Sequence, residues 1–143
     1  MARGIPSEVI RHFQLVPLFG SVSKKGIRSI VGAATEIDVR EGKVLVREGR
    51  TDRDLFVILR GTASVTRDGK RMRELVPGDF FGEMALLNGA VRTATVTART
   101  DMRVMVLGWR EMAVILEREP AIARCLLQAM AGRVRSNERS LTH

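Results

Sequence analysis

Cysteine, tyrosine and long apolar runs are scarce or absent in this chain of 143 residues. The single cysteine, Cys125, excludes an internal disulfide and a cysteine-rich metal site. No apolar stretch approaches the roughly 20 residues that span a bilayer. Charged residues interrupt the N-terminus where a secretory signal needs its apolar segment. These absences predict a protein of the reducing cytoplasm, with no metal, no added cofactor and no membrane partner.

The charge is strongly positive, at +8, but it is not concentrated in any segment. No run of roughly five or six basic residues occurs, which is the pattern of a nucleic-acid-binding tail. One tryptophan and no tyrosine leave little for a base-stacking platform. We therefore expect no nucleic-acid partner. The excess charge favours small anionic ligands instead.

The length is that of a single domain with one hydrophobic core, which we expect to cover residues 1–143. Hydrophobic periodicity divides the chain into three zones. Residues 1–33 show a helical pattern that begins near Pro6, residues 34–108 are rich in short strands, and residues 109–143 return to helix.

Short runs of Val, Ile and Thr separated by glycine turns fill the middle zone. The segment 62–75 reads as a hairpin with Asp68-Gly69 at its tip, because this dipeptide adopts the tight turn that joins two strands. Strands this short and evenly spaced predict a small antiparallel barrel or sandwich.

The last zone predicts two helices, separated where Pro120 ends the first and begins the second. Residues of the second helix recur at the spacing of one face. We interpret this stripe as core packing in preference to a dimer seam, although Arg133 on it fits a core poorly. Its members are Ile122, Cys125, Leu126, Ala129, Met130, Arg133 and Val134.

The segment 78–98, GDFFGEMALLNGAVRTATVTA, is mostly apolar or small, yet it contains Glu83 and Arg92. A buried charge needs a partner, so these two residues either pair with each other or face a ligand. A short helix that begins at Gly82 would present free backbone N–H groups to an anion. The planar fork of Arg92 suits two oxygens of one phosphate. A ligand with a phosphate beside a sugar hydroxyl would satisfy both charges.

The same residues resemble a known signature. Phe81-Gly82-Glu83-Met84-Ala85-Leu86, a turn, and Arg92-Thr93-Ala94 are similar to the phosphate-binding cassette of the cyclic-nucleotide-binding domain family. That family includes the catabolite activator protein, the regulatory subunits of cAMP-dependent kinase and cyclic-nucleotide-gated channels. The resemblance extends over about residues 16–134 and places the cassette at 81–94. It implies an α+β fold, an antiparallel double-stranded β-helix (a jelly-roll-like β-roll) flanked by N-terminal helices and two C-terminal helices.

The resemblance also implies roles for individual residues. Arg92 would bind the exocyclic phosphate, and Glu83 would accept a hydrogen bond from the ribose 2′-hydroxyl. The remaining cassette residues would supply backbone amides, clearance or the phosphate lining: Gly82, Met84, Ala85, Thr93 and Ala94. Val91 stands where the family often has proline. The base would be capped by a residue of the final helix, with Met130, Arg133 and Val134 as candidates.

A threonine after the arginine is associated in this family with acceptance of cGMP, but many such domains still prefer cAMP. We therefore place cAMP ahead of cGMP as the ligand. We expect a non-enzymatic regulatory module that acts on a protein effector not identified by the sequence, with a homodimer through the C-terminal helix as a further option. No P-loop, His-Glu-x-x-His or nucleophile-elbow motif occurs. The alternative is a β-roll without ligand that serves as a protein-interaction or basic nucleic-acid-binding module.

Overall fold

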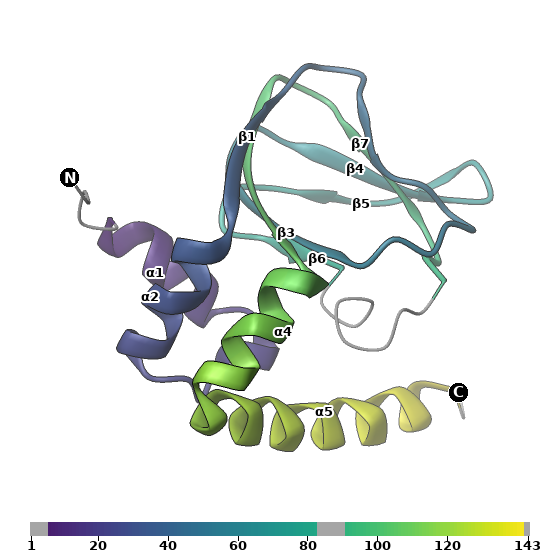
Figure 1. Ribbon diagram of the computed structural model, residues 1–143. Coiled ribbons are helices and arrows are strands. Elements are labelled where there is room, and N and C mark those ends of the chain that lie inside the picture. The colour runs from purple at the N-terminus through teal and green to yellow at the C-terminus, as the bar shows by residue number, and fades with distance from the viewer. Residues whose placement is uncertain (1–5, 83–90, 142–143) are drawn as a thin grey trace.

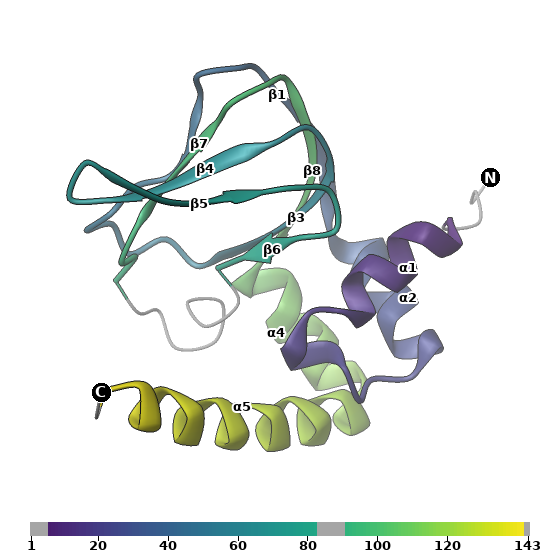
Figure 2. The ribbon, with the colours of Figure 1, turned by 180° about the vertical axis from the view of Figure 1, so that it is seen from behind.

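The computed structural model describes residues 6–82 and 91–141, with side chains described through Ala129 and at Ala131. Two four-stranded sheets lie above a group of helices (Figures 1 and 2). All strand pairs are antiparallel. The predicted α+β fold, a β-roll with helices at both ends, is confirmed.

The helices before the roll are short and pack on one another. They are α1 (Ser7–Gln14), the 3-10 helix η1 (Pro17–Phe19) and α2 (Lys24–Ala33). Ser23 caps α2, since its hydroxyl accepts a hydrogen bond of 3.1 Å from the backbone N–H of Gly26. The short helix η1 lies between α1 and α2 and buries Leu18 and Phe19.

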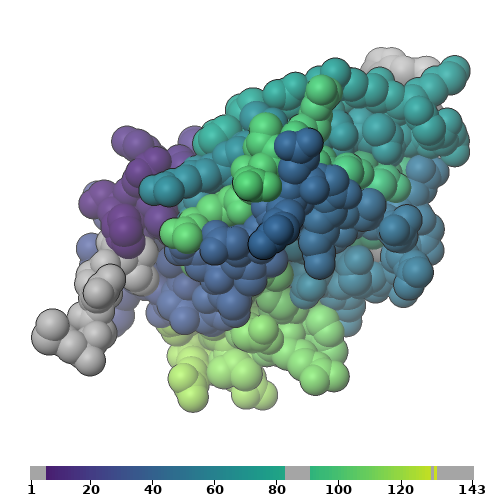
Figure 3. All heavy atoms as spheres, turned by 90° about the horizontal axis from the view of Figure 1, so that it is seen from above, coloured from purple at the N-terminus to yellow at the C-terminus, as the bar shows by residue number. Residues whose placement is uncertain are grey.

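Within the described residues, eight strands form the roll: β1 (Thr35–Val39), β2 (Val44–Val46), β3 (Asp54–Arg60), β4 (Ala63–Arg67), β5 (Lys70–Leu75), β6 (Phe80–Phe81), β7 (Thr95–Ala98) and β8 (Met102–Gly108). The first sheet has the order β1-β8-β3-β6 and the second β2-β7-β4-β5. The predicted hairpin is the β4–β5 pair, and its turn places Asp68 at φ 52° and Gly69 at φ 77°. Figure 3 shows the molecule from above, with the N-terminal helices, coloured purple, at one side of the roll, whose atoms are coloured blue to green.

Two helices follow the roll, α4 (Trp109–Arg118) and α5 (Pro120–Leu141). Figure 1 shows α5 running beneath the roll and well past the end of α4. The predicted core stripe of α5 is confirmed where side chains are described, because Ile122 and Leu126 are buried and Cys125 and Ala129 pack against them.

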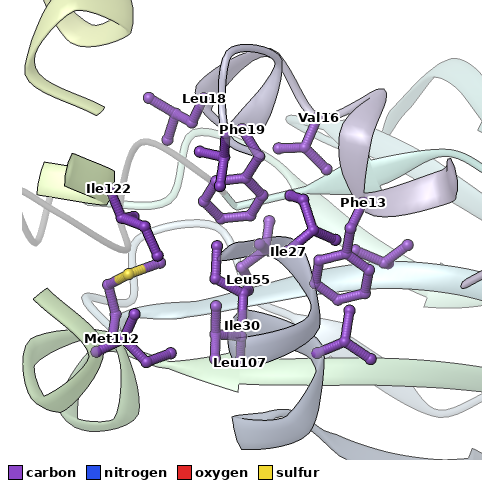
Figure 4. Close-up of a cluster of buried hydrophobic side chains, with 14 of the residues drawn as sticks. Phe13, Val16, Leu18, Phe19, Ile27, Ile30, Leu55, Leu107, Met112 and Ile122 are labelled. Carbon is purple, nitrogen blue, oxygen red and sulfur yellow. The ribbon is translucent and has the colours of Figure 1, made fainter. Parts of the chain in front are cut away.

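The hydrophobic interior consists of two clusters. One lies between the helices and strands β3 and β8, where Phe13, Phe19, Ile27, Leu55 and Met112 converge (Figure 4). The other fills the roll between its two sheets. The first sheet is therefore packed on both faces, by the helices on one and by the roll interior on the other. Residues at its edge are held firmly enough to support a site.

Candidate functional site

Arg92 is the single buried charged residue in the described part of the chain, with 7% of its surface exposed. It lies three residues before β7, in the connection that leads into the second sheet. A guanidinium keeps its charge at any physiological pH, so its burial is tolerated only if its N–H groups have partners. The partners of Arg92 therefore define the site.

Two groups accept hydrogen bonds from the guanidinium, one in the loop before β3 and one at the first residue of β3. The Arg92 Nε donates to Asp52 Oδ1 at 2.8 Å, and Nη2 donates to the same oxygen. Nη2 also donates to the backbone carbonyl of Asp54 at 2.6 Å. Arg92 is thus neutralised by Asp52, a partner that the sequence analysis did not identify.

The backbone of Arg92 is held by the loop between β2 and β3. Its N–H donates to the carbonyl of Arg50 at 2.8 Å, and its carbonyl accepts from the N–H of Gly49 at 2.9 Å. Since both main-chain groups and the side chain are anchored in one loop, the position of the guanidinium is fixed before any ligand arrives.

Gly82 lies directly against the same guanidinium. Its φ of 92° is in the left-handed region that favours glycine. A Cβ at this position would lie 2.5 Å from Arg92 Nη1 and 2.6 Å from the carbonyl oxygen of Asp54. The glycine in the predicted cassette is therefore required both by its backbone angle and by the approach of Arg92.

The residues after Arg92 are held by the β4–β5 hairpin. Arg67 Nε donates to the carbonyl of Thr93 at 3.0 Å. Thr93 is exposed and Ala94 is half-buried. At the hairpin tip, the N–H of Asp68 donates to Glu48 Oε1 at 3.1 Å, which joins the hairpin to the β2–β3 loop. The hairpin and that loop thus support the same short stretch of chain.

Asp54 connects this arrangement to α4. A Cβ on Gly108 would lie 3.0 Å from Glu111 Oε1 and 3.4 Å from Asp54 Oδ1, so both carboxylates face the N-terminus of α4. Burial raises the pKa of the Asp54 carboxyl above its ordinary value of 3.8, and the Asp52 carboxylate raises it further. Arg92 lowers this pKa, and Glu111 raises it. The backbone carbonyl of Asp54 therefore accepts a hydrogen bond from Arg92, while its side chain lies near the N-terminus of α4.

Several predicted site residues cannot be compared with the structure. Glu83, Met84 and Ala85 lie outside the described residues. Met130, Arg133 and Val134 lie on α5, but their side chains are outside the described part. The structure therefore brings together Gly82 and Arg92 of the predicted set, with Thr93 and Ala94 adjoining them.

Asp52 and Arg67 are the contacts that sequence reasoning missed. Asp52 stands 40 residues before Arg92, in the polar stretch Thr51–Asp54 that carries no motif. Its one signal is the presence of two carboxylates, Asp52 and Asp54, immediately before the apolar run Leu55–Leu59, where a buried arginine could find a counter-ion. Arg67 carries no signal beyond its place beside the hairpin turn.

The described residues contain neither a metal-binding cluster nor a membrane-spanning helix. Within 6–82 and 91–141, no three His, Cys, Asp or Glu side chains are grouped to hold a metal ion. Among the helices that the structure describes, none has both the length and the apolar character needed to cross a bilayer.

The comparison with known families agrees with this geometry. The model of the cyclic nucleotide-binding domain matches residues 36–119, which is more than half of the chain. The match includes the roll, the β2–β3 loop and Arg92. The chain belongs to the cyclic nucleotide-binding domain family.

Individual relatives come from several kinds of protein. A cyclic nucleotide-gated potassium channel of Rhizobium etli is 33% identical over 134 residues, which cover 88% of this chain and 38% of the channel. The N-terminal domain of a transcriptional regulator from Streptomyces coelicolor A3(2) has a TM-score of 0.80 at 27% identity, covering 88% of this chain and 94% of that chain. The regulatory domain of Toxoplasma gondii PKA, crystallised with cAMP, has a TM-score of 0.69 at 29% identity, covering 76% of this chain and 43% of that chain.

The match is to one part of the larger relatives. This chain spans between 30% and 38% of the length of three bacterial potassium channel proteins.

Proposed function

We propose that this chain is a non-enzymatic regulatory module that binds a cyclic nucleotide in the cytoplasm, with cAMP preferred over cGMP. Arg92 binds the exocyclic phosphate, and Glu83 accepts a hydrogen bond from the ribose 2′-hydroxyl. Gly82, Met84 and Ala85 supply backbone amides or clearance, and Thr93 and Ala94 line the phosphate. Residues 1–143 act as one domain, with the cassette at 81–94.

The observation that supports this proposal most directly is the buried guanidinium of Arg92. Its backbone is fixed by two hydrogen bonds to the β2–β3 loop, and Gly82 gives it room. A planar, preorganised guanidinium in a shielded position suits two phosphate oxygens, because little entropy is lost when the ligand binds. A cyclic phosphate keeps one negative charge, which a single arginine can balance.

The proposed preference for cAMP draws on a structural relative and on the residue after Arg92. A structural relative, the Toxoplasma PKA regulatory domain, was crystallised with cAMP. Thr93 directly follows Arg92 and is exposed, so its hydroxyl is free to meet a ligand. If Thr93 hydrogen-bonds the amino group of a guanine, it contributes to cGMP binding and not to cAMP binding.

The regulatory response is proposed to be closure of α5 over the ligand. The first turns of α5 are anchored in the core through Ile122 and Leu126. Its later turns extend beneath the roll, as Figure 2 shows from behind. Closure would bring one of Met130, Arg133 and Val134 to the base and change the surface offered to a protein effector or to a second copy of the chain.

Calorimetric titration of the purified chain with cAMP and cGMP tests the proposal. Arg92→Ala is expected to abolish binding, and Glu83→Ala to weaken it by about tenfold or more, because each removes a charge-assisted hydrogen bond to the ligand. Arg103→Ala is the matched control, since Arg103 also pairs with carboxylates but does so on the surface, with Glu36 and Asp38. Thr93→Ala should cost more affinity for cGMP than for cAMP.

Absence of binding to the wild-type chain at high micromolar concentrations of both nucleotides would reject the proposal. An equal loss on Arg103→Ala and Arg92→Ala would reject the role of Arg92. Turnover of either nucleotide would contradict the non-enzymatic assignment.

A further inference from the structure

The Arg92 guanidinium, which we propose binds the ligand phosphate, is already paired with the Asp52 carboxylate. Asp52 contacts Arg92 through both Nε and Nη2, which form one edge of the fork. On the opposite edge, Nη1 lies against the backbone of Gly82. A phosphate that takes two donors from the Nε edge must therefore take the place of the Asp52 carboxylate.

We propose that Asp52 is the resident counter-ion of Arg92, that the ligand phosphate replaces it, and that this exchange sets the affinity of the site. The inference rests on the proposed function, because it assigns the step by which that ligand gains Arg92. Asp52 is a positioning residue in the empty protein and a competitor of the ligand.

The exposure of the two side chains supports an exchange. The Arg92 side chain is 6% exposed, whereas that of Asp52 is 41% exposed. The guanidinium is thus held in place by the backbone of its surroundings, and the carboxylate approaches from the solvent side. A half-exposed carboxylate loses little by returning to water, while a buried guanidinium cannot remain without an anion.

The β2–β3 loop contains other basic groups with which the released Asp52 carboxylate can pair. Asp52 lines a surface cavity of about 380 Å³ together with Arg47, Arg50 and Thr51. Neither Arg47 nor Arg50 forms an ion pair with another described residue. Both side chains are exposed and lie in the same loop as Asp52. A carboxylate that leaves Arg92 therefore turns towards two guanidinium groups with no counter-ion among the described residues.

A carboxylate that remained would also oppose the ligand. The Asp52 and Asp54 carboxyl groups already repel each other, and Glu111 adds to this repulsion. A phosphate added beside them would be a further negative charge near one guanidinium, which like-charge repulsion disfavours. Movement of Asp52 removes the nearest of these charges.

The central test compares wild type with Asp52→Asn, using the full chain in calorimetry with cAMP and with cGMP. The variant should bind about tenfold more tightly, because the empty state loses a charge-assisted contact that the bound state does not contain. Glu74→Gln is the matched control, since the Glu74 side chain is 40% exposed and pairs with Arg71 at 2.8 Å. This control should change the affinity by less than about twofold, because exposed pairs contribute little.

Thermal unfolding adds a readout that a merely structural role would not produce. Asp52→Asn should lower the melting temperature of the empty protein, since Arg92 then lacks its counter-ion. With saturating nucleotide the melting temperature should approach that of wild type, with only the small difference that the exposed pair of Asp52 with Arg50 contributes. A contact that only stabilised the loop would lower both temperatures alike.

Arg50→Gln tests whether the Asp52 carboxylate turns towards Arg50 when the ligand displaces it from Arg92. It should weaken nucleotide binding by about threefold in the wild-type background, which is the size expected for one exposed ion pair. In the Asp52→Asn background it should have no effect. An equal loss in both backgrounds would show that Asp52 does not move towards Arg50 and would overturn this part of the proposal.

The wild-type protein provides a measurement that needs no stable Asp52 variant. The ¹⁵N resonance of the Arg92 Nε–H, assigned by its loss in Arg92→Lys, should shift when nucleotide replaces the carboxylate. An unchanged resonance at saturation would overturn the proposal, as would an affinity of Asp52→Asn equal to or weaker than that of wild type.

The outcomes separate this inference from the proposed function. If wild type binds nucleotide and Asp52→Asn binds no more tightly, the inference fails and the function remains. If neither protein binds, the function fails and the inference falls with it. Binding by Asp52→Asn alone would support both, with Asp52 as a strong internal competitor.

Discussion

The two sheets of the roll differ in how they are covered. In the first sheet, four successive residues of β3, Leu55–Ile58, are buried because helices pack on one face and the roll interior on the other. In the second sheet, β5 buries only Leu75 of its six residues. The first sheet is therefore a rigid layer, and the second is half open to solvent.

The candidate site lies where these two regions meet. The loop that leads into the covered sheet supplies the carboxylate of Asp52, and the first residue of β3 supplies the carbonyl of Asp54. The open sheet supplies Arg92, in the connection that leads into β7. The partners of Arg92 thus lie at the edge of the covered sheet, and Arg92 lies at the edge of the open sheet. A ligand can therefore reach Arg92 without disturbing the core.

Truncating one core residue in each sheet should give the largest difference. Leu55→Ala in the covered sheet should lower the free energy of unfolding by about 3 kcal/mol, because Leu55 has no exposed surface. Val65→Ala in the open sheet should cost about 1 kcal/mol or less, because Val65 is only half-buried. Urea unfolding followed by circular dichroism measures both. Equal costs would show that the two sheets are equally covered.

Substitution of Gly82 tests whether close approach, and not backbone angle alone, defines the junction between the sheets. Gly82→Ala should lower the free energy of unfolding by about 2 kcal/mol and weaken nucleotide binding, since its Cβ would displace Arg92. Gly42→Ala is the matched control, with the same φ of 92° and no atom of the described residues within 4 Å of the added Cβ. The control should cost about 1 kcal/mol, from the backbone angle alone. Indistinguishable results would refute the steric argument.

The smallest effect concerns the charge of Asp54 at the edge of the covered sheet. Because the pKa of Asp54 is raised in the folded protein, its ionised form is penalised, and this penalty is complete above the raised pKa. Asp54→Asn should therefore stabilise the protein at pH 7, by only a few tenths of a kcal/mol because solvent screens the partly exposed carboxyl.

The benefit of Asp54→Asn should disappear as the pH falls below the ordinary value of 3.8, where the carboxyl is protonated in both states. Asp38→Asn is the contrasting variant, because it removes an exposed partner of Arg103 and should not stabilise at neutral pH. Destabilisation by Asp54→Asn at pH 7 would contradict the assigned direction of the pKa.

Much of the fold is predictable because its signals are local. The β4–β5 hairpin follows from Asp68-Gly69, whose backbone angles suit a tight turn. The end of α4 and the start of α5 follow from Pro120. The burial of Leu18 and Phe19 was not predicted, because three residues of 3-10 helix have too little periodicity to reveal a buried face.

The candidate site was predictable only in part. Arg92 stands out as a charge in an apolar segment, and Gly82 stands next to a predicted helix start. Asp52 has no such contrast with its surroundings, since its neighbours are polar as well. The counter-ion of a buried arginine can come from any segment that the fold brings near it, and local patterns do not specify which.

By itself, the sequence determined the order of helices and strands, the turn residues, the apolar faces and the segment that carries the charge. Each of these depends on residues within a few positions of one another. The tertiary structure alone decided that Arg92 is neutralised by Asp52, 40 residues earlier, and that its backbone is held by Gly49 and Arg50. The physical reason is that a buried charge is satisfied by its neighbours in space, and these exist only once the two sheets have closed on each other.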